Sequence, residues 1–441
     1  MHLRGRLLAA LSAVASAVLL PLAAASPASA SAPVQSCNET HQARIFFWAV
    51  ACTQPGQPVI GAFGTWRNVP ITFGSGGDAG SAQASNYLRM VPNTEGGMFA
   101  NSIEVGLYAE KTGTTTSTYG PQWTELGNSG GRTKAITAGI NPAVADNMNH
   151  TYMTVRQASG DQWDVLYDFN WVGSTTDQLK VPRGNSNRID IGLEVMGPQL
   201  VTVPEIANRV QFMAENKAWS RAATADTAQV ATLGICGQSK GLPSDPTAVY
   251  TAPYCFNTKL TDATKFTQWT VSKPGPTRAQ ASPLPPQSTG TLNGVDQKAL
   301  SQCLATDPDT CLTSVPGLSA CVQTAKVCNA AALQSAPRSS ASAKDTPGEA
   351  ADIGARAAAS FGVAQNTLRV TTGTRAPGAA GTFGLSFQSP AAADTAVVTV
   401  ESSAANHGLE KRGLTFQGLR ATYSASTGQL LDACWGQLCR S

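Results

Sequence analysis

The stretch QWDVLYDFNWVG, residues 162–173, decides the fold class predicted for this chain. Its odd-numbered positions are aromatic or apolar, whereas Asp164, Asp168 and Asn170 occupy even-numbered ones. Successive side chains of an extended strand point to opposite faces, so the alternation predicts one β-strand over residues 162–172. One face of that strand would carry four aromatic rings, those of Trp163, Tyr167, Phe169 and Trp171.

An aromatic strand face either fills the space between two packed sheets or stacks against a ligand such as a sugar ring. We expect the middle of this face to be core and its end to reach the rim of the sheet. The candidate ligand contacts at that rim are Trp171, Tyr167, Asp168 and Asn170.

The same two-residue period recurs through residues 33–272, with Gly, Asn and Ser turns between the segments. In residues 188–195, for example, Ile189, Ile191, Leu193 and Val195 alternate with polar residues or glycine. Many alternating strands and few helices predict a mainly β protein. We expect a large antiparallel β-sandwich or jelly roll, concanavalin-like in architecture.

The remainder of the chain is divided by segments rich in proline and small polar residues, at 273–290 and 334–344. They predict extended linkers. Between them, residues 293–333 carry four cysteines and helical spacing, which predicts two or three short helices joined by disulfides. A unit this small needs such bridges.

Residues 346–441 begin with Thr346-Pro347-Gly348-Glu349, which has the spacing of a helix capping box. Strands and a polar loop at 406–413 are expected after it, so this part predicts an α+β module. The helix and the ending ATYSASTGQLLDACWG, residues 421–436, resemble the small PepSY modules. That resemblance implies a binding or inhibitory role without catalysis.

The first 30 residues indicate export. Arg4 and Arg6 precede an apolar run that ends in small residues, and two A-x-A patterns place cleavage near Ala30 or Ala32. We therefore expect residues 1–30 to be a signal peptide and the protein to be extracellular. No later stretch is long and apolar enough to predict a membrane span.

The ten cysteines agree with an oxidising compartment. They predict disulfides between neighbours in sequence, although the middle four permit three connectivities. No C-x-x-C pattern or cluster of histidines suggests a metal site, and no cofactor motif is present. The cysteines are Cys37, Cys52, Cys236, Cys255, Cys303, Cys311, Cys321, Cys328, Cys434 and Cys439.

Charge gives no reason to expect nucleic acid as a partner, because basic and acidic side chains nearly balance once the first 30 residues are set aside. Nor does any G-x-S-x-G pattern indicate a serine nucleophile. The remaining catalytic candidates are carboxylates on alternating strands: Glu104, Asp190 and Glu194. A cross-strand pair such as Glu104 with Glu194 would suit glycoside cleavage if the strands are neighbours.

Three functions remain open. The first is a secreted, non-enzymatic protein that binds a glycan or a cell-envelope polymer. The second is a secreted polysaccharide hydrolase that uses Glu104, Asp190 or Glu194. The third is a disulfide-braced inhibitor or interaction protein. Neither the ligand nor the oligomeric state follows from the sequence.

Overall fold

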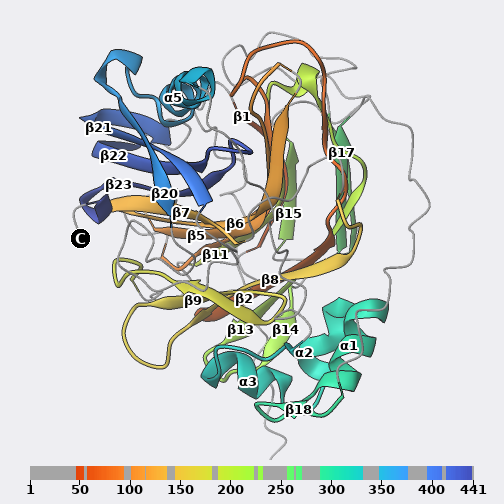
Figure 1. Cartoon of the computed structure of the whole chain (residues 1–441). Coiled ribbons are helices and arrows are strands. Elements are labelled where there is room, and N and C mark those ends of the chain that lie inside the picture. Colours follow the sequence, from red (N-terminus) through yellow and green to blue (C-terminus); the bar gives the residue numbers. More distant parts are fainter. Residues whose placement is uncertain are drawn as a thin grey trace, which may run out of the picture. The chain divides into compact units, whose positions relative to one another are not determined.

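A computed structural model confirms the mainly β fold, with two large antiparallel sheets (Figure 1). It describes residues 46–53, 57–93, 101–114, 116–136, 145–180, 187–222, 227–231, 256–262, 265–270, 289–330, 347–375, 395–409 and 414–439. The predicted signal peptide, the linker predicted at 334–344 and residues 273–288 of the other predicted linker lie outside these ranges. All described residues belong to one compact unit, Ser31–Ser441.

Sheet A has eleven strands, in the order β15-β1-β11-β4-β5-β6-β7-β23-β22-β21-β20. Its strands are β1 (Phe46–Thr53), β4 (Gln83–Val91), β5 (Ser102–Lys111), β6 (Ser117–Gly127), β7 (Gly130–Ala135), β11 (Arg188–Met196), β15 (Thr227–Ala231), β20 (Arg369–Arg375), β21 (Thr395–Leu409), β22 (Leu414–Ser424) and β23 (Leu430–Gly436).

Sheet B packs against the first part of sheet A, in the order β10-β9-β8-β2-β13-β17-β16, with β14 beside β13. Two-stranded ladders join β3 (Thr72–Phe73) to β12 (Val201–Thr202), and β18 (Thr291–Leu292) to β19 (Val295–Asp296). The strands of sheet B are β2 (Val59–Arg67), β8 (Asn149–Arg156), β9 (Trp163–Tyr167), β10 (Asn170–Ser174), β13 (Ile206–Ala214), β14 (Trp219–Arg221), β16 (Phe256–Asp262) and β17 (Lys265–Thr270).

The core between the two sheets is built by the predicted alternation. The four apolar residues of β11 are all buried in it, as are Trp163 and the pair Trp66 and Tyr152. The last two rings stack with their centroids 3.8 Å apart. The polar residues of β11 consequently face the other side of sheet A, where the candidate site lies.

The prediction of one strand over residues 162–172 is wrong, because the stretch is a hairpin of β9 and β10. Asp168 and Phe169 form its turn, with φ of 50° and 59°. This left-handed conformation at both central residues matches the twist of the flanking strands. The turn also reverses the chain after Tyr167, so the four aromatic rings do not share one face.

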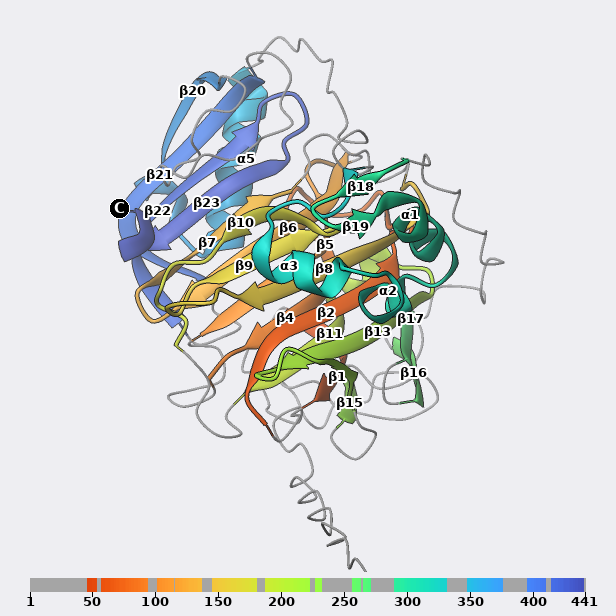
Figure 2. The same ribbon diagram turned by 90° about the horizontal axis from the view of Figure 1, so that it is seen from below.

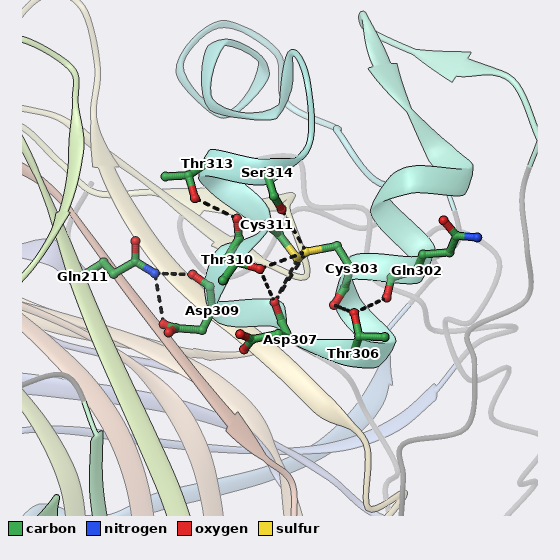
Figure 3. Close-up of a disulfide and its surroundings, with 10 residues drawn as sticks. All are labelled: Gln211, Gln302, Cys303, Thr306, Asp307, Asp309, Thr310, Cys311, Thr313 and Ser314. Carbon is green, nitrogen blue, oxygen red and sulfur yellow. Dashed lines mark hydrogen bonds between the residues drawn. A yellow bond between two sulfur atoms is a disulfide. The ribbon is translucent and has the colours of Figure 1, made fainter. Parts of the chain in front are cut away.

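The cysteine-rich segment is helical, as predicted, and covers the outer face of sheet B (Figure 2). It contains α1 (Gln297–Thr306), the 3-10 turn Pro308–Thr310, α2 (Cys311–Ser314) and α3 (Leu318–Thr324). Figure 3 shows how one end is attached: Gln211 of β13 donates to the Asp309 carboxylate over 3.0 Å. Phe63, Met213 and Phe169 pack under the segment.

Three disulfides join neighbours in sequence, as expected: Cys303–Cys311, Cys321–Cys328 and Cys434–Cys439. Cys52 is also disulfide-bonded. Cys37, Cys236 and Cys255 lie outside the described residues. No helix in the described ranges is long and apolar enough to cross a membrane.

The C-terminal part is one helix on strands that continue sheet A. Helix α5 (Pro347–Phe361) begins at the predicted proline and packs on β21 and β22. Strand β23 pairs with β7, so the sheet runs unbroken from the sandwich into this part. The polar loop expected at 406–413 is partly wrong, because β21 extends to Leu409 and pairs there with Leu414.

Candidate functional site

The three predicted carboxylates lie on one face of sheet A because of strand register. Strand β4 separates β5 from β11, and Arg89 of β4 is the lateral partner of both Glu104 and Asp190. Glu194 lies four residues further along β11, on the same face. The structure therefore brings together all three acids that the sequence analysis selected.

A single buried guanidinium links them. Arg89 donates from Nε to Glu104 Oε1 over 2.7 Å and from Nη1 to Asp190 Oδ2 over 3.0 Å. Its Nη2 lies 3.9 Å from Glu194 Oε2 and donates to the Tyr87 hydroxyl over 3.0 Å. The fork geometry of arginine, with several donors in one plane, suits such a multiple contact.

Further donors bond to the carboxylates of this network. The Tyr87 hydroxyl donates to Glu194 over 3.4 Å, and the Tyr108 hydroxyl donates to Glu104 over 3.2 Å. Arg188 donates to both oxygens of Asp190, at 2.5 and 2.7 Å. Buried charges are stable only when they are paired and hydrogen-bonded in this way.

Charge and burial act in opposite directions on the pKa values of Asp190 and Arg89. Burial alone would raise the pKa of Asp190, but Arg188 and Arg89 hold it below its ordinary value. Burial alone would lower the pKa of Arg89, but neighbours including Asp190 and Glu194 raise it. Burial and the charge of Glu194 raise the pKa of Tyr108, so its phenol stays protonated.

A cavity of about 140 Å³ opens beside this network. Two of its acids, Glu104 and Glu194, line the wall together with polar and aromatic side chains from β4, β5, β6, β7 and the C-terminal part. The polar lining includes Gln83, Ser85, Glu110, Thr118, Gln122, Thr124 and Thr133, and the aromatic lining includes Tyr108, Tyr119, Phe361, Tyr423 and Trp435.

Helix α5 and strands β22 and β23 supply one wall of the cavity. Trp435 lies directly against Gly131 of β7, where an added Cβ would come within 2.3 Å of the indole ring. Phe361 packs on Trp435 with ring centroids 5.9 Å apart. Ser360 of α5 donates to Glu110 of β5 over 3.2 Å. These contacts hold α5 beside the polar face of the sandwich.

The predicted aromatic contacts lie elsewhere, in the β9–β10 hairpin of sheet B. Tyr167 and Asp168 both contact the imidazole of His150. Asn170 forms an isolated bridge to Val327. Lys326 lies over the ring of Trp171, with Nζ 4.3 Å from the centroid. The four candidates therefore face the core rim and the helical segment, away from the cavity of sheet A.

His150 is held between two carboxylates. Its Nδ1 lies 2.6 Å from Asp168 Oδ2, and its Nε2 lies 2.9 Å from Asp146 Oδ2. The Tyr167 hydroxyl lies 2.8 Å from Nδ1, and the two rings stack 5.1 Å apart. Burial alone would lower the pKa of His150, but Asp168 and Asp146 raise it to about 10. The imidazole is therefore a cation at neutral pH.

This raised pKa predicts a specific pH dependence of stability. The contribution of His150 is complete below its ordinary pKa of about 6.5 and is lost as the pH rises through about 10. We expect His150→Gln to remove this contribution, on the order of a few kcal/mol. The difference in unfolding free energy between wild type and variant, from urea titrations, should therefore shrink from pH 7 to 11.

The difference in unfolding free energy between wild type and His150→Gln is the quantity to measure. Lys134 changes the stability of both proteins with pH in the direction opposite to His150, and its effect cancels in that difference. Burial, opposed by Asp432 and assisted by Arg375 and Arg132, lowers the pKa of Lys134 to about 6. Its contribution to stability consequently increases as the pH rises above 6. A wild-type-to-variant difference that stays constant over this pH range would contradict the pKa given for His150.

Several residues of the site were not selected from the sequence. Arg89 and Tyr87 lie on the polar face of β4, where Gln83, Ser85, Tyr87 and Arg89 alternate with residues that are apolar except for Asn86. That alternation is a readable signal for one polar face. No local sequence pattern indicated that α5 and β23 line the cavity, because their position depends on the pairing of β23 with β7.

No group of three or more His, Cys, Asp or Glu residues in the described ranges is arranged to hold a metal ion.

No family model matches the chain, and no curated protein matches it. Among solved structures, it is similar to the CBM40 module of a Ruminococcus gnavus IT-sialidase, at 12% identity and a TM-score of 0.15, over 32% of this chain and 78% of that one. It is also similar to a β-porphyranase of the human gut bacterium Bacteroides plebeius, at 10% identity and a TM-score of 0.16, over 36% of this chain and 66% of that one. At these scores neither likeness supports an argument about ligand or activity.

Proposed function

We propose that this chain is an exported, non-enzymatic protein that binds a carbohydrate, either free or in a cell-envelope polymer, in the cavity of sheet A. The observation that carries the proposal is the lining of that cavity, which combines aromatic faces with carboxylate, amide and hydroxyl groups. Sugars offer both apolar C–H faces and hydroxyl groups, so such a mixed lining suits them. The volume is close to that of an engineered cavity of about 150 Å³ that binds benzene, a six-membered ring.

Binding is favoured over hydrolysis by the position of Arg89. The guanidinium contacts Glu104 and Glu194, which keeps their nearest oxygens within about 9 Å of each other, a spacing compatible with glycosidases. A glycosidase, however, needs one of its two acids protonated to act on the leaving group. Here both acids are instead engaged by the same buried guanidinium. Hydrolysis through Glu104, Asp190 or Glu194 remains the alternative function.

Export and the role of the C-terminal part belong to the same proposal. The disulfides are typical of proteins that fold outside the cytosol, and they support the signal peptide expected at residues 1–30. The PepSY-like resemblance of residues 346–441 implied a binding module. In agreement with that role, Ser360, Tyr423 and Trp435 of this part line the cavity.

A binding screen with the full exported chain tests the function. We expect binding to a subset of immobilised glycans and no release of reducing ends in the same wells. Gln122→Ala should weaken binding about tenfold, because a buried ligand hydroxyl would lose its partner on the cavity wall. The matched control is Gln162→Ala, since Gln162 is exposed and lies outside the cavity.

The screen separates the three functions. Release of reducing ends that Glu104→Gln abolishes would establish the hydrolase instead. Absence of both binding and release would favour the interaction protein. Equal loss of binding in Gln122→Ala and Gln162→Ala would remove the cavity from the proposal.

A further inference from the structure

The wall of the cavity is anionic. Among the described residues that line it, the charged ones are Glu104, Glu110 and Glu194. The cations that neutralise these acids, Arg89 and Arg356, are 2% and 1% exposed and do not belong to the lining. A ligand therefore meets carboxylates first, with the guanidinium groups behind them.

Glu110 contacts the described residues through one of its two carboxylate oxygens. Glu104 and Glu194 are engaged by the Arg89 network. At Glu110, the bonds from Gln83 (3.3 Å) and Ser360 (3.2 Å) and the contact with Arg356 (3.9 Å) all involve Oε1. None of the contacts that Glu110 makes with described residues uses Oε2. The Glu110 side chain is 19% exposed and lines the cavity.

The charge that a ligand meets at the cavity wall favours a cation. Glu104 and Glu194 line the wall, and the guanidinium of Arg89 that they share lies behind them. Glu110 faces a single cation, Arg356, at 3.9 Å. In a partly buried site, two unit charges about 4 Å apart interact more strongly than in water. A second carboxylate brought by a ligand would be repelled for the same reason.

We propose that the cavity selects saccharides that carry a free amine, with the ammonium group of a hexosamine residue paired to Oε2 of Glu110. N-acetylated sugars lack the charge, and uronic acids carry the opposite one. This inference rests on the proposed function, because it assigns a ligand class to the same cavity.

Calorimetric titration of the full exported chain with trisaccharides tests the selectivity. The probes are the trimers of glucosamine, N-acetylglucosamine and galacturonic acid, at pH 6 and low salt. We expect the glucosamine trimer to bind about tenfold more tightly than its N-acetylated counterpart, and the galacturonate trimer to bind most weakly. The preference should decrease in about 0.5 M NaCl, because salt screens the charge contribution.

The outcomes distinguish the two proposals. Equal affinities for the first two trimers, or a preference for galacturonate, would overturn the amine selectivity while leaving carbohydrate binding intact. If no glycan binds, either in this titration or in the screen, both the amine selectivity and the carbohydrate-binding function would be overturned.

Glu110→Gln locates the preference within the cavity. The amide keeps an oxygen for Gln83 and Ser360 but removes the charge. We expect a loss of about tenfold in affinity for the glucosamine trimer and little change for the N-acetylated trimer. Glu215→Gln is the matched control, since Glu215 is exposed and outside the cavity. A preference that survives Glu110→Gln in a variant with an unchanged circular dichroism spectrum would overturn the role of Glu110.

Discussion

Replacing Arg89 with methionine should lower the free energy of unfolding by about 3–5 kcal/mol. The guanidinium is buried and bonds Glu104 and Asp190. Its loss leaves Glu104 and Glu194 buried without their shared cation, and Asp190 with Arg188 alone. Methionine fills part of the volume, so the cost is mainly electrostatic rather than that of an empty cavity.

The pH dependence of this loss separates charge from packing. Arg89 is one of the cations that hold the pKa of Asp190 below its ordinary value, so Asp190 is easier to protonate without it. The destabilisation of Arg89→Met, measured by guanidinium chloride titration, should therefore be smaller at pH 4 than at pH 7. A loss of unfolding free energy that is the same at pH 4 and pH 7 would indicate a packing defect.

Arg420→Met provides the matched control. Arg420 is 48% exposed and pairs with Glu401 over 3.2 Å. Exposed pairs of this kind contribute about 0–1 kcal/mol because water and salt screen them. Equal costs for the two arginine variants would contradict the description of the Arg89 network as a buried ionic cluster.

Phe169→Ala should cost about 3–5 kcal/mol, the usual range for a fully buried phenylalanine. The ring stacks on Phe63 with centroids 5.8 Å apart and packs beneath the helical segment. The Phe169 carbonyl also accepts a hydrogen bond from the Cys328 backbone over 3.0 Å. We expect faster amide hydrogen exchange across α1, α2 and α3 in the variant, because the helices lose the ring on which they rest.

The left-handed backbone at Phe169 predicts which of two variants, Phe169→Ala or Phe169→Gly, is the more stable. At φ of 59° alanine carries a steric cost that glycine does not. Phe169→Gly should therefore be about as stable as Phe169→Ala or more stable, by up to about 1 kcal/mol. At Phe63, a buried residue within β2, the order should reverse, since glycine weakens a regular strand. The same order at both positions would contradict the turn geometry.

The hairpin at residues 163–174 shows where sequence reasoning failed. Such turns usually contain Asn-Gly or Asp-Gly, because both central residues need positive φ. Here the pair is Asp-Phe, and alternation continues through it without a break. The conformation is stabilised by burial of the ring and by the Cys328 bond, both made with a segment more than 120 residues further along the chain.

The candidate site shows a partial success. The sequence selected Glu104, Asp190 and Glu194 because alternation places each on the polar face of its strand. It did not indicate that β4 lies between their strands, so the predicted pair of acids is a cluster around Arg89. The aromatic wall from Phe361 and Trp435 likewise required the pairing of β23 with β7.

The sequence by itself determined the mainly β class, the buried face of strands such as β11 and the helix that begins at Pro347. It favoured local pairing of the cysteines without fixing the connectivity of the middle four. These features depend on neighbours within a few residues, where side-chain period, capping and short loops act directly. Strand order, the Asp168–Phe169 turn and the cavity were decided only by the tertiary structure. Their free energy comes from contacts between segments distant in sequence, and alternation determines which way a side chain points without determining what lies opposite it.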